Sequence, residues 1–109
     1  MELTRLADLR GSERSRLFEG GTHGSTVSFF WISYPEPGLG PGLHRHPYDE
    51  TWLMLEGRAL LEIAGEQREV GEGDIAVAPA RAPHTFTSLT ALRVLCIHAN
   101  PELVQEELE

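Results

Sequence analysis

The sequence predicts an all-β domain, either a barrel or a sandwich of antiparallel strands. Between residues 26 and 98, short runs of β-forming apolar residues recur, and glycine or proline bounds each run. No helical hydrophobic period is visible over the same stretch. The predicted strands are 26–34, 43–46, 50–56, 58–63, 67–70, 74–78, 84–88 and 92–98, and the turns between them lie mainly at 35–42, 56–57, 65–66, 71–73 and 79–83.

The two flanks of this block are predicted to be short. Residues 1–25 form an N-terminal arm, in which the three-residue spacing of Leu3, Leu6 and Leu9 fits either one helical turn or an edge strand. We expect residues 26–99 to form the barrel.

Residues 100–109 are predicted to form a short C-terminal helix or tail. Asn100 can cap a helix that begins at Pro101, and Val104 and Leu108 would share one face of it.

Length and charge exclude several classes of protein. The chain has 109 residues, which allows one domain over residues 1–109, and 9 basic against 17 acidic residues give a net charge of −8. All the basic residues are arginines, so Schiff-base chemistry and lysine-dependent phosphate loops are excluded. The acidic balance also makes nucleic acid an unfavourable partner.

Cysteine content and hydropathy favour a cytoplasmic protein that does not associate with membranes. Cys96 is the only cysteine, so no disulfide can form within the chain and no thiolate cluster is available for a metal. Neither a signal-peptide pattern nor an apolar run of membrane-spanning length is visible.

Histidine and glutamate form the pattern that carries chemistry. His44 and His46 alternate on a predicted strand and therefore project from the same face. Glu50 begins the next strand after a short turn, and His84 arrives from a strand distant in sequence. Three imidazoles and one carboxylate suit a divalent transition metal, which could be Fe, Mn, Ni, Co or Zn, with one ion per chain. Four protein ligands on an ion that accepts six leave two positions open.

The spacing of this cluster resembles the first motif of the cupin superfamily. That motif runs Gly, five residues, His, one, His, three or four, Glu, six, Gly, and Gly38, His44, His46, Glu50 and Gly57 match every fixed position.

The second cupin motif is matched in part. It runs Gly, five residues, Pro, one, Gly, two, His, three, Asn, and the corresponding residues here are Gly73, Pro79, Arg81, His84 and Ser88. Arg81 stands where the family has glycine, and Ser88 stands where it has asparagine.

The resemblance implies a double-stranded β-helix, or jelly-roll barrel, with His44, His46, Glu50 and His84 as metal ligands. Cupins include dioxygenases, isomerases, decarboxylases, cyclases and proteins that only bind ligands. Our first hypothesis is a small metal-dependent enzyme of the oxygenase type, in which Glu50 is also catalytic because it leaves the ion to act as a base. The alternatives are a non-redox isomerase, decarboxylase or cyclase, and a non-catalytic small-molecule-binding cupin.

A substrate pocket is predicted beside the metal. Trp52 and Met54 share the strand parity of Glu50, Phe86 shares that of His84, and His98 could also line the cavity. Arg81 is either a turn residue in an ordinary conformation with its guanidinium in water, or a cation at the cavity mouth that recognises a carboxylate or phosphate.

The expected partners are a small-molecule substrate or ligand and a second copy of the chain. Small cupins usually dimerise, and the apolar stretch 27–32 would be a liability if it lay exposed at a sheet edge.

Overall fold

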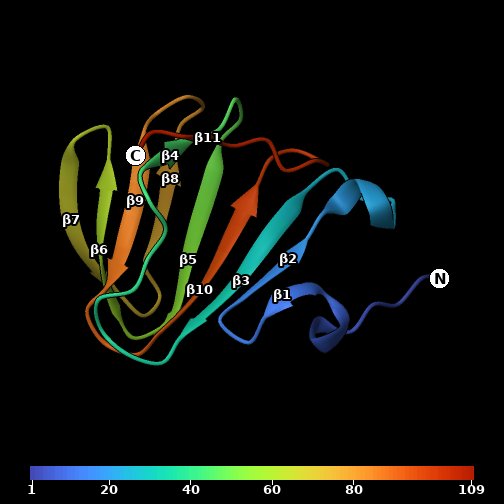
Figure 1. Cartoon of the computed structure of the whole chain (residues 1–109), viewed down its shortest axis with the longest axis horizontal. Helices are drawn as coiled ribbons and strands as arrows, with labels where there is room; N and C mark the ends of the chain where they lie inside the picture. Colours follow the sequence, from blue (N-terminus) through green and yellow to red (C-terminus); the bar gives the residue numbers. More distant parts are fainter.

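Two antiparallel β-sheets face each other in the computed structural model, which describes residues 1–109 (Figure 1). The order of strands is β1-β2-β3-β10-β5-β8 in the six-stranded sheet and β11-β4-β9-β6-β7 in the five-stranded sheet. The strands are β1 (Arg10–Ser12), β2 (Ser15–Phe18), β3 (Ser28–Tyr34), β4 (His44–Arg45), β5 (Glu50–Glu56), β6 (Arg58–Ile63), β7 (Glu66–Gly71), β8 (Ile75–Ala78), β9 (His84–Ser88), β10 (Leu92–His98) and β11 (Glu106–Glu107). Two short 3₁₀ turns, Leu6–Asp8 and Gly20–His23, complete the structure, and neither they nor any other segment forms a helix that could cross a membrane.

The predicted all-β jelly-roll is confirmed, and each of the eight predicted strands is present within two residues of its expected bounds. Strand periodicity explains this agreement. Residues alternate between buried and more exposed positions along β5 and along β10, so one face of each strand packs into the interior.

The core fills the space between the two sheets. Trp52, Met54 and Val94 project from the six-stranded sheet, and Leu61 and Phe86 project toward them from the five-stranded sheet. All five are at most 3% exposed. This apolar layer lies directly beneath the residues of the predicted metal site, because Trp52 follows Glu50 on the inner face of β5 and Phe86 follows His84 on that of β9.

The N-terminal segment contributes both elements that its leucine spacing allowed. Leu6–Asp8 form one 3₁₀ turn, and Arg10–Ser12 form the edge strand β1. β2 then covers β3, which lies between β2 and β10. The expectation that stretch 27–32 lies at a sheet edge is therefore wrong, because β2 and β10 pair with β3 on its two sides.

The predicted C-terminal helix is also wrong. The Asn100 side chain donates a hydrogen bond to the carbonyl of Glu102 and so caps no helical N–H group. The tail instead runs extended along the upper end of the barrel (Figure 1), where β11 pairs with β4 and Arg45 binds the carboxylate of Glu106 through two hydrogen bonds. A helix of this length is only marginally stable in water, so backbone pairing with β4 replaces the hydrogen bonds that the helix would have formed.

Candidate metal centre

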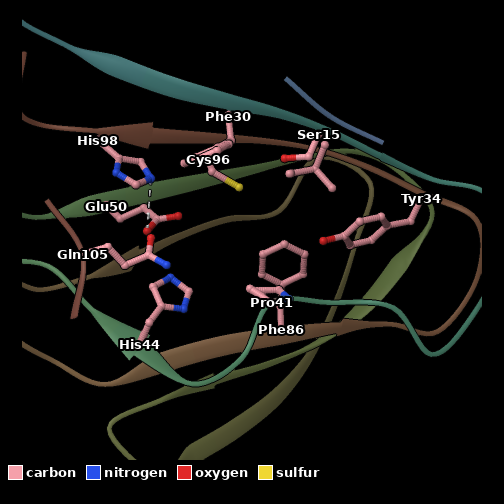
Figure 2. A pocket seen from close by; sticks show the side chains of 11 residues that line it. Ser15, Phe30, Tyr34, Pro41, His44, Glu50, Phe86, Cys96, His98 and Gln105 are labelled. Carbon is pink, nitrogen blue, oxygen red and sulfur yellow. Dashed lines mark ion pairs between the residues drawn. The ribbon is translucent and has the colours of Figure 1, made fainter. Parts of the chain in front are cut away.

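Two cross-strand pairs bring the site together from opposite sheets. His44 on β4 lies directly opposite His84 on β9, and Glu50 on β5 lies directly opposite His98 on β10. His46 follows β4 immediately. Figure 2 shows His44 facing Glu50 and His98 across the interior. All five side chains are buried, with at most 5% of their surface exposed.

The carboxylate of Glu50 is the centre of this cluster. Its Oε1 atom lies 3.0 Å from Nε2 of His46 and 3.1 Å from Nε2 of His84. Nε2 of His98 lies 3.4 Å from the same oxygen. One ligand atom from each of the four residues named by the sequence motif, His44, His46, Glu50 and His84, lies within 4.8 Å of every other.

Backbone carbonyls fix the protonation of the three motif histidines. The Nδ1 atoms contact carbonyl oxygens at 2.7 Å (His44 to Gly42), 2.8 Å (His46 to Val104) and 2.9 Å (His84 to Ala82). A carbonyl oxygen can only accept a hydrogen bond, so each Nδ1 carries the proton. In the neutral ring Nε2 then holds a free lone pair, and all three lone pairs are aimed at the space beside Glu50.

This arrangement fits a metal ion. Nε2 of His46 is fully buried and has no hydrogen-bond partner, which is a costly state for a polar atom. One carboxylate can compensate about one added proton, and several imidazolium ions so close together would repel one another. A single divalent cation satisfies the three nitrogens and the oxygen at once, so the cluster could hold one transition metal ion, as predicted.

The carboxylate of Glu50 is oriented so that one of its oxygens is available to such an ion. The indole N–H of Trp52 donates a hydrogen bond to Oε2, which leaves Oε1 facing the histidines. Burial alone would raise the pKa of Glu50, but the Nε2 protons that His46, His84 and His98 can direct at the carboxylate outweigh burial and hold the pKa well below its usual range; a metal ion at the cluster would take the place of the protons on His46 and His84. The carboxylate is therefore ionised throughout the physiological range.

A hydrogen-bond chain behind Glu50 was not foreseen from the sequence. The backbone N–H of Val104 donates to the Tyr48 hydroxyl, which in turn lies 2.8 Å from Nδ1 of His98. Burial raises the pKa of Tyr48, so its phenol keeps a proton to donate to Nδ1. Nε2 of His98 then carries the ring proton and points it at Glu50. His98 therefore supports the carboxylate and offers no lone pair to a metal.

A cavity of about 200 Å³ opens beside the cluster. Of the predicted pocket residues, Phe86 and His98 line it. Trp52 and Met54 point to the same side of the sheet but are fully buried in the core and do not reach the cavity. Arg81 is exposed and lines a neighbouring depression with His46 and Val104.

Sequence reasoning missed several residues that line the cavity. Phe30, Ile32 and Tyr34 line it from β3. Their spacing of two residues places them on one face of the strand, so the sequence could have predicted all three together if β3 had been expected to face the site. Gln105 reaches it from the tail (Figure 2), and no sequence signal indicated this because the tail was expected to be helical.

The backbone of Arg81 explains why the family motif has glycine at this position. Its φ angle is +68°, in the left-handed region, so the expectation of an ordinary turn conformation is wrong. Its N–H donates to the carbonyl of His46 at 2.7 Å, which ties the turn before β9 to the end of β4. The left-handed conformation costs a residue with a Cβ about 1 kcal/mol.

The fold and the site together define a cupin. The sequence profile of the cupin domain matches residues 31–98, more than half of the chain, and the protein belongs to this family. Two curated relatives, both uncharacterized, come from Methanocaldococcus jannaschii (34% identical over 62 residues) and Streptomyces coelicolor (33% identical over 58 residues). The matched regions cover 54% and 52% of this chain and 50% and 55% of the relatives, so the match spans about half the length of each.

Solved structures show the same fold. Oxalate decarboxylase from Bacillus subtilis superposes with a TM-score of 0.80 at 21% identity, over 94% of this chain and 31% of that one. A Streptococcus pyogenes protein of unknown function gives 0.68 at 24% identity, over 94% and 90%. KdgF from a Halomonas species gives 0.65 at 22% identity, over 72% and 71%. The B. subtilis decarboxylase contains Mn(II) centres.

The hydrogen-bond chain predicts the behaviour of a Tyr48→Phe variant. The change removes only the hydroxyl and leaves the ring stacked on His46. Loss of such a supporting hydrogen bond is expected to weaken Co(II) binding by about tenfold or more, measured by isothermal titration calorimetry. Tyr34→Phe removes a hydroxyl from the far side of the cavity and is the control; equal affinities in the two variants would contradict the assigned chain.

Metal affinity is predicted to fall on acidification. Histidine must be unprotonated to bind a metal, and the ordinary imidazole pKa is about 6.5. Burial is the main reason that the pKa of His44 is lowered, so this ligand stays neutral to more acidic pH than an exposed histidine. We expect Co(II) affinity to be nearly constant above about pH 7 and to fall steeply below about pH 6. An affinity unchanged down to about pH 4 would exclude histidine ligation.

Proposed function

We propose that this protein is a metal-dependent enzyme of the oxygenase type that converts a small organic molecule held inside the barrel. One observation carries the proposal: two of the four residues of the cluster, His44 and Glu50, line a cavity of about 200 Å³. A molecule in this cavity would lie next to any ion that the cluster holds.

The chain's own residues would position that molecule. Phe30 and Ile32 from one sheet and Phe86 from the other form apolar walls that exclude water from the bound molecule. A divalent redox-active ion at the cluster would polarise a substrate oxygen and supply the chemistry that dioxygen requires.

Glu50 is the proposed group for proton transfer, and His98 is its supporting residue. The sequence prediction that Glu50 takes a proton from the substrate stays a proposal. Its lowered pKa makes the carboxylate a weak base, so Glu50 would hold a proton only briefly before passing it back to the reacting molecule. His98 lies 3.4 Å away, directs its Nε2 proton at the carboxylate and accepts a hydrogen bond from Tyr48 at Nδ1, so these two side chains hold Glu50 in its ionised form between transfers.

A non-redox reaction is the second candidate. Its support is the structural likeness to oxalate decarboxylase over 94% of this chain, which is a likeness of fold. In that case the same cluster would hold a Lewis acid for decarboxylation, isomerisation or cyclisation.

Oxygen uptake distinguishes the two candidates. The protein loaded with Fe(II) is incubated with catechol, acetylacetone or maltol, three compact oxygen chelators, in an oxygen-electrode chamber. The oxygenase proposal expects uptake that depends on one of these compounds and disappears both in His84→Ala and in Zn(II)-loaded protein. Anaerobic conversion by the Zn(II) or Ni(II) form, without oxygen uptake by the iron form, would contradict it and favour the non-redox candidate.

We also propose that the protein is a cytoplasmic homodimer. The support for the compartment is the single cysteine, Cys96, which is buried and free. For the dimer, β8 is an edge strand whose Ile75 and Val77 side chains are 67% and 54% exposed. Apolar edge strands favour pairing with a second copy.

Light scattering tests the assembly. The expected mass is twice the 12.1 kDa of one chain, and Val77→Lys should return the protein to the monomer mass. Leu89→Lys, at an exposed apolar residue outside β8, is the control and should remain dimeric. A wild-type monomer at micromolar concentration would contradict the proposal.

A further inference from the structure

The cavity beside the cluster has polar side chains at its two ends and apolar side chains between them (Figure 2). Figure 2 shows His44, Glu50, His98 and Gln105 gathered at one end and Tyr34 and Ser15 at the other. Between them the walls are apolar. The volume of about 200 Å³ is below the usual range for drug-sized ligands, so the cavity suits a compact molecule.

No cationic side chain lines this cavity. Arg45 and Arg81 line the neighbouring depression instead, where Arg45 is paired with Glu106. No other carboxylate lines the cavity, and burial raises the pKa of the Tyr34 phenol, which therefore stays uncharged. Glu50 is therefore the only formal charge that the chain contributes to the cavity.

Charge balance follows from these assignments. A divalent ion beside one carboxylate and three neutral imidazoles has a net charge of +1. A ligand with one negative charge brings the site to neutrality. A dianion leaves an uncompensated negative charge against Phe30, Ile32 and Phe86, where no guanidinium is available to offset it, and this is energetically unfavourable.

We propose that this site selects compact, mainly apolar molecules that carry at most one negative charge, and that it discriminates against small dicarboxylates. The inference rests on the proposed function, because the charge balance requires the metal. It separates this chain from the substrate named for oxalate decarboxylase, to which it is similar in fold.

Oxamate and oxalate are suitable probes because they have nearly the same size and both chelate a metal through two oxygens. Oxamate is a monoanion and oxalate is a dianion, so the ratio of their dissociation constants isolates the cost of one charge. Binding is followed through the visible absorption of Co(II)-loaded protein, and the same ratio is measured for free Co(II) in the same buffer. The expected result is that the protein shifts the ratio toward oxamate by about tenfold or more relative to free Co(II).

A variant with an added cation provides the matched test. Gln105 lines the cavity and hydrogen-bonds Glu107, so the double variant Gln105→Arg/Glu107→Gln places an arginine there without the Glu107 carboxylate, while Glu106 stays paired with Arg45. Its control is Gln105→Met/Glu107→Gln. The arginine variant should shift the ratio back toward oxalate by about tenfold, and the methionine variant should not.

The outcomes separate the two proposals. Co(II) that binds normally while the oxamate to oxalate ratio equals that of free Co(II), and does not respond to the added arginine, would overturn the charge selectivity alone. Failure of the wild-type protein to bind Co(II) would overturn both the proposed function and this inference.

Discussion

Three imidazole nitrogens and one carboxylate oxygen lie within 4.8 Å of one another in the buried interior of this protein, and the strands and the C-terminal tail around them hold each group in place. Oε1 of Glu50 lies 3.0 Å from Nε2 of His46 and 3.1 Å from Nε2 of His84, and Nε2 of His46 is buried with no hydrogen-bond partner. The two cross-strand pairs, His44 with His84 and Glu50 with His98, hold the groups together because each is fixed in the register of a different sheet. The barrel therefore provides a preformed site whose donor atoms suit a divalent cation.

One residue of the C-terminal tail, Val104, orients two side chains of the cluster. The carbonyl of Val104 accepts the Nδ1 proton of His46, and its N–H begins the chain through Tyr48 and His98 to Glu50. Two of the four ligands are thus oriented by a segment that supplies no ligand itself. The same segment brings Gln105 to the cavity, so metal binding and substrate selection are coupled to how the tail lies on the barrel.

Three of the four residues of the cluster, His44, His46 and Glu50, could be predicted from the sequence because their spacing is local, whereas His84 was indicated by the second cupin motif. Strand parity places His44 and His46 on one face, and the glycines of the motif mark the turns that bring in Glu50. The tail could not be predicted this way. A capping residue followed by proline is a helix signal only when nothing else competes for the backbone, and here β4 competes from 61 residues away. Trp52 was also predicted only in part. Strand parity predicted that its side chain points to the same side as Glu50, but not that its indole N–H donates a hydrogen bond to Glu50.

Elemental analysis of protein purified without added metal tests directly whether His44, His46, Glu50 and His84 hold an ion. The wild-type protein and His23→Ala, which alters a histidine outside the cluster, should each contain close to one divalent transition ion per chain. His84→Ala should contain substantially less, because it removes one of three nitrogens that converge on the ion. Equal metal content in all three proteins, or the absence of metal from all three even after dialysis against Mn(II), Fe(II) and Zn(II), would contradict the assigned centre.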